Sequence, residues 1–378
     1  MKVLYITNYG TMYGANRSLY NMICLLKKEY GIEPYVLASG GGPIIDLCEN
    51  EGIQCFCDDF RISVVDENVK HKSLKKITRR IMRYKEFISF AKKIEKLGIK
   101  FDIIHSNSSI FDVGLFLARR WRVPHVWHIR EFAKEDYGLE SIFTKREILK
   151  KYRMSNALVV ISDAIRDRVN SYGEGIKTYR IYNGIDVCEK YKKKYCNEGV
   201  IKFCIVGSIK EQKGQFDCVK ACSLLKQRNI DNFKLYIVGG IGGIHFKQIE
   251  KYIDEHPEIK ENIVFTGYCD NVDEILKNMD VGVMASYEEA FGRVTIEYMS
   301  NYMPVIGTNT GGTPEILTRD GRFFEPADIV QLSNHMEDLM KHKEKLQTEG
   351  EKARRIAEKF RREYNARDIY GMYIDITS

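Results

Sequence analysis

The chain has 378 residues, which is long for one hydrophobic core and predicts two domains. Its hydrophobic content of 44% and charged content of 29% are ordinary for a globular protein, and no apolar run approaches the roughly 20 residues of a membrane-spanning helix. The net charge is +7, and the ten cysteines include no C-x-x-C pair, which argues against a disulfide framework or a zinc site. Residues 1–7 lack a signal-peptide pattern, so we expect a cytoplasmic protein.

Short apolar segments alternate with helix-like segments through the first half of the chain. Residues 2–7 form a predicted strand, a loop with Gly10 and Gly14 follows, and residues 17–28 have the apolar spacing of a helix. This alternation predicts a doubly wound, mostly parallel sheet, in which ligands bind beyond the carboxyl ends of the strands. Further strands are predicted within residues 34–38, 102–106, 124–131, 157–161 and 178–182, and the polar side chains at their ends are His105, His128, Ser162 and Asn183.

Positive charge is concentrated in residues 69–100. This segment has twelve Lys and Arg residues and only two acidic ones, Glu86 and Glu95, so it carries +10 while the rest of the chain carries −3. The spacing of its apolar residues predicts a basic amphipathic helix or helix pair. Three interpretations stay open: a solvated helix with its apolar residues packed inward, attraction to an anionic bilayer, and binding of an anionic glycan. Nucleic-acid binding is not expected, because no groove-reading motif accompanies the charge. The apolar residues concerned are Leu74, Ile77, Ile81, Tyr84, Ile88 and Ala91.

A second α/β series follows a polar stretch, residues 187–200, which is a predicted linker. Its first strand, residues 201–206, leads through a loop that ends in Lys213 and Gly214 into a helix. Later strands are predicted at residues 234–238, at 263–266 before Gly267 and Tyr268, and at 281–285, and the last thirty residues have helical composition.

The segment that follows residues 281–285 has the most informative pattern. It reads Ser-Tyr-Glu-Glu-Ala-Phe-Gly-Arg-Val-Thr-Ile-Glu over residues 286–297, between a strand and a predicted helix at 294–301. A strand, a glycine turn and a helix start present backbone N–H groups to a phosphate, and Gly292 lets the backbone approach a ligand. Glu289 and Glu297 can each accept hydrogen bonds from paired sugar hydroxyls. The segment is therefore suited to a sugar, a diphosphate and a ribose.

The two glutamates, with seven residues between them and Phe291-Gly292 inside, resemble the E-x7-E element of the family 4 retaining glycosyltransferases. The resemblance extends to Pro-Val-Ile-Gly at 304–307 and Gly-Gly-Thr-Pro-Glu-Ile at 311–316. It implies the GT-B fold, with two Rossmann-like domains facing each other across a cleft. The domains would be an acceptor-side domain (1–186), the linker (187–200), a domain that binds the nucleotide-sugar (201–360), and a final helix (361–378) that crosses back to the first domain.

The resemblance also implies roles for individual residues. Glu289 would hold the donor sugar and, with His128 near the reaction centre, form the catalytic pair, while Glu297 would hold the ribose hydroxyls. Arg130 and Glu131 would contact the acceptor. The donor would further be bound by the glycine loop at Gly14, by Lys213 on the diphosphate, by Gly267 and Tyr268 beside the base, and by the backbone of Phe291, Gly292, Arg293, Val294 and Thr295.

The leaving diphosphate needs positive charge near it. The sequence has no D-x-D motif for a metal, so we expect a metal-independent enzyme without a cofactor, in which a helix start and cationic side chains stabilise the phosphates. One residue departs from the family pattern: Ser208 stands where the family has an arginine, and Lys210 or Arg293 would have to supply that charge. The family retains anomeric configuration, which implies front-side displacement with the leaving phosphate as base.

The sequence thus predicts a hexosyltransferase that moves a sugar from a nucleotide-diphosphate donor to a glycan or a lipid-linked acceptor. We expect a role in surface polysaccharide or glycolipid synthesis, with the protein peripheral on the inner face of the membrane through its basic segment. Two alternatives remain open: a non-catalytic relative that binds a nucleotide or glycan, and a sugar-nucleotide epimerase of the same fold.

Overall fold

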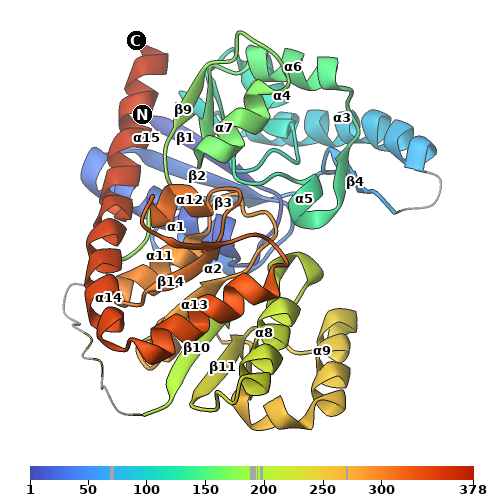
Figure 1. Ribbon diagram of the computed structural model, residues 1–378. Helices are drawn as coiled ribbons and strands as arrows, with labels where there is room; N and C mark the ends of the chain where they lie inside the picture. The colour runs from blue at the N-terminus through green and yellow to red at the C-terminus, as the bar shows by residue number, and fades with distance from the viewer. Residues whose placement is uncertain (69–71, 188–192, 194, 196–198, 270) are drawn as a thin grey trace. The chain divides into compact units, whose positions relative to one another are not determined.

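The computed structural model describes residues 1–68, 72–187, 193, 195, 199–269 and 271–378 (Figure 1). The chain forms two compact units. Unit 1 comprises Met1–Gly184 together with Arg362–Ser378, and unit 2 comprises Ile185–Arg361. Most of the predicted linker, and residues 69–71 of the basic segment, lie outside the described residues. No helix in the described part of the chain is both long and apolar enough to span a bilayer.

Unit 1 is built on a seven-stranded parallel sheet with the order β3-β2-β1-β5-β6-β8-β9. Its central strands are buried on both faces because helices cover both sides. A short antiparallel pair, β4 and β7, lies outside this sheet. The strands are β1 Lys2–Thr7, β2 Glu33–Ala38, β3 Gln54–Cys57, β4 Val64–Asp66, β5 Ile103–Ser106, β6 His125–Ile129, β7 Leu139–Ser141, β8 Ala157–Val160 and β9 Thr178–Arg180. The helices are α1 Gly14–Tyr30, α2 Pro43–Asn50, α3 Lys72–Lys96, α4 Val113–Trp121, α5 Lys134–Tyr137, α6 Lys145–Met154, α7 Asp163–Asn170 and α15 Arg362–Thr377.

Alternate residues of β1 divide between two cores. Val3 and Tyr5 belong to the core that includes residues of α1, α2 and α15, whereas Leu4 and Ile6 belong to the core that includes residues of α3 and α4. The C-terminal helix α15 is thus an integral part of unit 1, and the rings of Tyr30 and Tyr370 stack with centroids 4.5 Å apart.

Helix α3 forms where the basic segment predicts a helix, but the expectation that its apolar residues pack inward is wrong for most of them. Of the six, Ala91 is buried, and the other five are between 39% and 63% exposed, although the ring of Tyr84 also lies 6.1 Å from that of Phe116. The buried face instead carries Phe87, Phe90 and Ile94. The side of α3 that faces the core is therefore not the predicted one. It includes a charged residue, Arg83, which is only 2% exposed.

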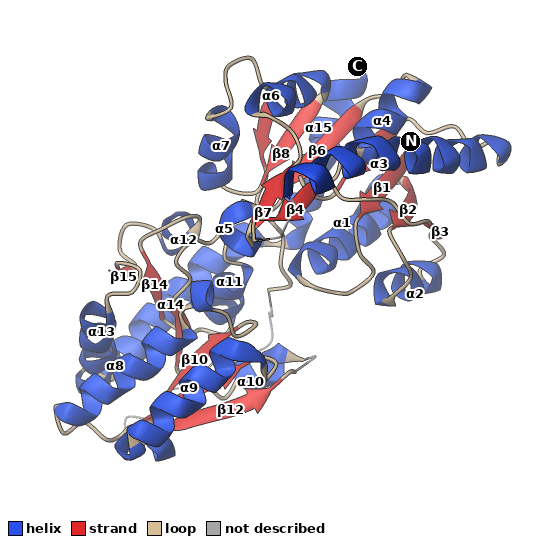
Figure 2. Ribbon diagram, turned by 90° about the vertical axis from the view of Figure 1, so that its right-hand side faces the viewer, coloured by secondary structure: helices blue, strands red, loops and turns tan. Residues whose placement is uncertain are grey.

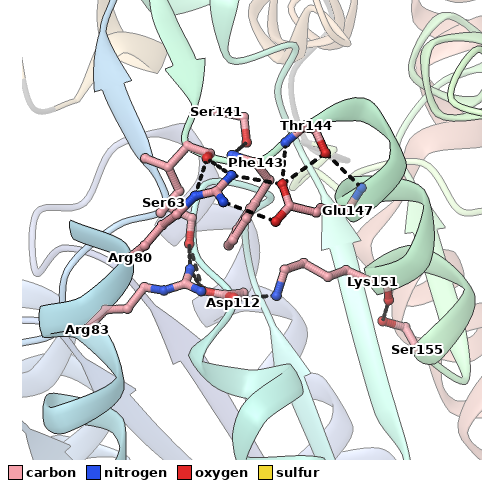
Figure 3. A network of polar contacts seen from close by, with 11 residues as sticks. Ser63, Arg80, Arg83, Asp112, Ser141, Phe143, Thr144, Glu147, Lys151 and Ser155 are labelled. Atoms are coloured by element: carbon pink, nitrogen blue, oxygen red, sulfur yellow. Dashed lines mark hydrogen bonds and ion pairs between the residues drawn. The ribbon is translucent and has the colours of Figure 1, made fainter. Parts of the chain in front are cut away.

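One buried charge pair and one partly exposed pair anchor α3 (Figure 3). Arg83 donates to Asp112 at 3.0 Å, and Asp112 also accepts from Lys151 of α6 at 2.8 Å and from Ser63 at 2.7 Å. One turn earlier, Arg80 donates to Glu147, whose carboxylate belongs to the capping box at the start of α6. Removing one partner of a buried pair leaves the other charge uncompensated, so this network fixes the orientation of α3.

Unit 2 has a six-stranded parallel sheet with the order β12-β11-β10-β13-β14-β15. One continuous core connects this sheet with residues of α8, α9, α13 and α14. The strands are β10 Ile201–Val206, β11 Phe233–Val238, β12 Ile263–Gly267, β13 Val281–Met284, β14 Val305–Thr308 and β15 Arg322–Phe324. The helices are η1 Glu211–Lys213, α8 Gln215–Gln227, α9 Gly243–Glu255, η2 Pro257–Asn262, α10 Val272–Leu276, α11 Arg293–Ser300, α12 Thr313–Leu317, α13 Ile329–Lys341, α14 Glu344–Ala357 and η3 Glu358–Phe360 (Figure 2).

Both sheets reverse their strand order beside their first strand. In unit 1 the chain runs outward from β1 to β3 and then returns to β5 on the other side of β1. In unit 2 it runs from β10 to β12 and returns to β13 on the other side of β10. Loops diverge at such a switch point, which leaves a crevice at the carboxyl ends of the two strands. The site residues of each unit are therefore expected in the loops after β1 and β5, and after β10 and β13.

Candidate active site

Two loops meet at the switch point of unit 2. Lys213 comes from the loop after β10 and Glu289 from the loop after β13, and the lysine Nζ donates to the glutamate Oε2 at 2.7 Å. The hydroxyl of Ser286 donates to the same oxygen at 3.2 Å. The structure thus brings together a cation and a carboxylate that are 76 residues apart in sequence.

Close backbone packing holds these loops in place. A Cβ at Gly214 would lie 2.2 Å from the carbonyl oxygen of Ala285, and the N–H of Tyr287 donates to the carbonyl of Gln212 at 2.9 Å. Gly214 also has a φ of +70°, which favours glycine. The position of Lys213 is therefore set by the loop that carries Glu289.

A third loop, after β14, supports Glu289 from its backbone. The N–H of Gly312 donates to the carbonyl of Glu289 at 2.7 Å. Gly311 has a φ of +56°, and a Cβ there would lie 2.2 Å from the same carbonyl oxygen. The hydroxyl of Thr308 donates to the carbonyl of Ser286 at 2.7 Å. A Cβ at Gly312 would lie 2.8 Å from Cα of Phe291, so both glycines of the 311–316 motif are required for the loop to pack against the segment that carries Glu289.

The start of α11 combines a left-handed glycine with the second glutamate of the motif. Gly292 has a φ of +89° and precedes the helix without a side-chain cap. The N–H of Thr295 donates to the carbonyl of Gly292 at 2.9 Å, and helix starts of this kind present backbone N–H groups toward an anion. Arg293 donates from Nε to Glu297 at 2.8 Å, and the buried hydroxyl of Thr295 has no hydrogen-bond partner within the described residues. Val294 also lies in this first turn.

The side chain of Phe291 has a structural role: it is buried, and its ring lies 6.0 Å from that of Phe360. Only the backbone of Phe291 can serve a ligand in the way the sequence predicts. At the end of β12, Gly267 has a φ of +74° and Tyr268 is exposed, as a residue that stacks on a base requires. Ser208, which replaces the family arginine, is exposed in the loop after β10.

In unit 1, four buried side chains form a relay that ends at His128. The Nδ1 atom of His128 lies 3.1 Å from Nε2 of His105, and Nδ1 of His105 lies 2.6 Å from the hydroxyl of Tyr373. The Tyr373 hydroxyl lies 3.2 Å from that of Tyr5. Burial lowers the pKa of both histidines well below the ordinary value, and the nearby charge of Arg130 lowers it further, so both rings are neutral at pH 7.

Arg130 determines which nitrogen of His128 carries the proton. Its NH2 group lies 3.3 Å from Nδ1 of His128, and its other nitrogens donate to Asn107 and Asn183. A guanidinium can only donate, so Nδ1 of His128 must accept and Nε2 must carry the hydrogen. This Nε2 atom is buried and has no hydrogen-bond partner in the part of the chain that the structure describes.

The other predicted residues of unit 1 have different environments. Glu131 accepts from Ser108 at 2.7 Å and from the backbone and hydroxyl of Ser109, and burial raises the pKa of its carboxyl. The hydroxyl of Ser162 accepts from the N–H of Ile165, so Ser162 is a helix cap.

In the glycine loop, Gly14 begins α1, where a Cβ would meet no atom within 4 Å. Gly10 is the glycine that packing requires, because a Cβ there would lie 2.2 Å from the carbonyl oxygen of Gly41.

Two family models together span most of this chain. The model described as "Glycosyltransferase Family 4" matches residues 12–189, and the model described as "Glycosyl transferases group 1" matches residues 188–356. The chain belongs to glycosyltransferase family 4. Its two units have the GT-B fold: the structure of Anabaena Alr3699/HepE in complex with UDP superposes with a TM-score of 0.78 at 18% identity, covering 99% of this chain and 100% of that one. Staphylococcus aureus TarM superposes with a TM-score of 0.75 at 14% identity, with 100% and 98% covered.

Three relatives illustrate that the sequence similarity is distant, between 23% and 28% identity. The chain is 28% identical over 268 residues to the uncharacterized glycosyltransferase MJ1178 of Methanocaldococcus jannaschii, with 68% of each chain covered. It is 24% identical to Protein CapJ of Staphylococcus aureus, of which the match spans 60%. The match to the UDP-Gal:alpha-D-GlcNAc-diphosphoundecaprenol alpha-1,3-galactosyltransferase of Escherichia coli is 23% identical and covers 88% of this chain and 86% of that protein.

Several residues of this glycosyltransferase are placed at the site only by the structure. Ser286 and Thr308 lie at the carboxyl ends of β13 and β14. In the sequence, the only sign of their role is that each is a polar residue that follows an apolar strand. Tyr5 and Tyr373 carry no such signal, because they lie on a buried strand and a helix 368 residues apart. A hollow of about 440 Å³ between α8 and α9 contains Lys210 but neither Lys213 nor a motif glutamate, so we assign no donor group to it. The residues that line it include Phe216, Lys220, His245, Gln248, Tyr252 and Tyr287.

Proposed function

We propose that this glycosyltransferase transfers a hexose from a nucleotide-diphosphate donor to a glycan or lipid-linked acceptor, with retention of anomeric configuration and without a metal ion. The observation that carries the proposal is the Lys213–Glu289 pair at the switch point of unit 2, beside the start of α11. These groups provide the positive charge that a diphosphate needs and the carboxylate that sugar hydroxyls need, side by side.

In the donor complex, the ammonium of Lys213 would form an ion pair with the diphosphate in addition to its contact with Glu289. A lysine ammonium has three donors, so it can contact a phosphate oxygen and remain within reach of Glu289. The N–H groups at the start of α11 would donate hydrogen bonds to the phosphate oxygens, as helix N-termini do. Glu297, held by Arg293, would receive the ribose hydroxyls. Arg293 thus positions Glu297, and Lys210 lines the hollow between α8 and α9, which leaves Lys213 as the candidate for the charge that Ser208 does not supply.

His128 would act as a neutral hydrogen-bond donor at the reacting sugar. The tautomer set by Arg130 places a proton on the Nε2 atom, which has no partner among the described residues. Such a fixed donor costs no reorganisation when it stabilises a developing charge or orients a hydroxyl. The deprotonation of the acceptor would fall to the leaving phosphate, in keeping with front-side displacement, because a neutral His128 with Nε2–H is a poor base.

For the donor we propose a UDP-sugar, and for the acceptor a lipid-linked diphosphate sugar in surface polysaccharide or glycolipid synthesis. The Anabaena neighbour was crystallised with UDP, with UDP and glucose, and with UDP-glucose. The Escherichia coli relative has a name that gives a UDP-galactose donor and an undecaprenyl diphosphate acceptor. An acceptor of that kind lies in a membrane, which favours a protein that acts peripherally on the cytoplasmic face.

The test has two stages. Thermal shift and calorimetry with UDP and UDP-sugars, with and without EDTA, should show binding that EDTA does not change. Transfer to a short lipid-linked acceptor should then give a product whose anomeric proton coupling in NMR matches that of the donor.

Each of the other functions has its own signature in these assays. Binding without transfer to any acceptor would favour the non-catalytic relative, and conversion of the donor with no acceptor present would favour the epimerase. Inversion at the anomeric carbon, or activity that EDTA abolishes, would overturn the retaining or the metal-independent part of the proposal.

A further inference from the structure

The outward face of α3 carries an apolar stripe. Leu74, Ile77, Ile81, Tyr84 and Ile88 are between 39% and 63% exposed. Their spacing of three, four, three and four residues places them along one side of a helix. Scattered exposed apolar residues are ordinary on a protein surface, but a contiguous row of five along one helix marks an interaction surface.

Lysines flank this stripe on its solvent side. A helix turns by about 100° per residue, which places Lys85, Lys92 and Lys96 next to the stripe and away from the core. All three are exposed. The two acidic residues of the helix are both engaged by arginines outside it, Glu86 by Arg61 and Glu95 by Arg120. The outward face is therefore apolar along one side and positive along the other.

The inward arginines prevent α3 from rolling to bury the stripe. Arg80 and Arg83 point toward α6 and bind Glu147 and Asp112 (Figure 3). Turning the stripe inward would break both pairs and leave Asp112, which is only 3% exposed, without its guanidinium partner. The exposed stripe is thus a fixed feature of unit 1.

We propose that this face, Leu74 to Ile88 with its flanking lysines, docks the enzyme on a bilayer that contains anionic phospholipid. Amphipathic helices of this composition lie in the headgroup region, with their apolar side in the acyl boundary and their lysines on the lipid phosphates. A second copy of the chain fits the charge less well, because pairing stripe with stripe would bring two rows of lysines together. The inference deepens the proposed function, since a lipid-linked acceptor would be presented at that bilayer, but membrane binding can be measured without transfer.

The experiment is co-sedimentation of the full chain with phosphatidylcholine vesicles, with and without phosphatidylglycerol. The wild type should bind the anionic vesicles and release them in high salt. Lys85→Gln with Lys92→Gln should weaken binding by roughly fivefold for each lysine lost. Ile77→Ser with Ile81→Ser should weaken it by about tenfold or more, because the apolar anchor is lost.

Matched controls come from unit 2. Ile241 and Ile244 are 61% and 69% exposed, and their double serine variant should bind vesicles as the wild type does. Lys247→Gln with Lys260→Gln removes the same charge from exposed positions in unit 2 and should have a much smaller effect than the α3 lysine pair. Circular dichroism and the unfolding midpoint of each variant should match those of the wild type, because the substituted side chains are exposed.

Three results would overturn the inference. One is vesicle binding that the Ile77/Ile81 variant retains in full. Another is wild-type protein that does not bind anionic vesicles. The third is a concentration-dependent dimer in sedimentation velocity that the Ile77/Ile81 variant abolishes, which would make the stripe an interface between copies. Transfer to the short lipid-linked acceptor, measured in parallel without vesicles, separates the two proposals: vesicle binding without any transfer refutes the proposed function alone.

Discussion

Replacement of Lys213 by methionine tests the centre of the proposed donor site. Methionine keeps most of the aliphatic length of lysine and removes the charge. A hydrogen bond to a charged group contributes about 1.5–3 kcal/mol, so loss of the lysine contact with the diphosphate should lower kcat/KM for the donor by about 10- to 150-fold. In the free enzyme, Lys213 is 34% exposed and its pair with Glu289 is partly solvated, so the loss of stability should stay near or below about 1 kcal/mol.

The assay measures donor affinity by calorimetry with UDP-sugar, kcat/KM by UDP release, and stability by urea unfolding. Lys220→Met is the matched control: Lys220 is also 34% exposed and paired with a buried carboxylate, Asp217, but it lines the hollow between α8 and α9. It should leave donor affinity and kcat/KM within about twofold of the wild type. A Lys213→Met enzyme with wild-type donor affinity, or a Lys220→Met enzyme that loses more, would show that the diphosphate lies elsewhere and would refute the reasoning.

Three further predictions follow from the same structure. His128→Ala should lower kcat by about 10²–10³-fold with a small change in donor affinity, because it removes a preorganised donor; an unchanged kcat in stopped assays would exclude His128 from the reaction. Gly311→Ala should lose both stability and activity because its Cβ would lie 2.2 Å from the carbonyl oxygen of Glu289, whereas Gly371→Ala in α15, where a Cβ meets nothing, should raise the urea midpoint slightly; equal effects would contradict the role of the 311 turn. Acid should destabilise unit 1, because burial lowers the pKa of His105 and His128 well below the ordinary value and that of His125 to about 3. The unfolded chain then binds protons below about pH 6.5 that the native state does not, so stability is fully present above that pH and falls by up to about 1.4 kcal/mol per pH unit for each histidine as the pH is lowered. Urea unfolding from pH 7 to pH 5 measures this slope, and His125→Asn, if it folds, should reduce it; a slope that does not change would contradict the assignment.

The sequence by itself predicted most of the strands and the family of this protein. Buried parallel strands are continuous apolar runs, so β1, β8 and β10 are visible as local patterns, and the string from Ser286 to Glu297 is short enough to be recognised without any contact map. Short or half-exposed strands such as β3 and β15 were not predicted, because only their neighbours in the sheet define them.

Periodicity in α3 identified a helix but not the side that faces the core. The sequence offers two stripes, one with Leu74, Ile77 and Ile81 and one with Phe87, Phe90 and Ile94, and both have helical spacing. The second stripe packs into the core of unit 1, on the side where Asp112 accepts from both Arg83 and Lys151, and this partner is known only once α4 and α6 are in place.

The tertiary structure alone decided how the site residues are connected. The residue types, their positions after predicted strands and the family resemblance were enough to predict Lys213, Glu289 and His128 as site residues, because each of these features is visible in the sequence. The 2.7 Å hydrogen bond of Lys213 with Glu289 joins residues that are 76 positions apart. The relay through His105 joins Tyr373 to His128, which are 245 positions apart. Hydrogen bonds act over about 3 Å and have no signature along the chain, so only the packed fold shows which side chains share one.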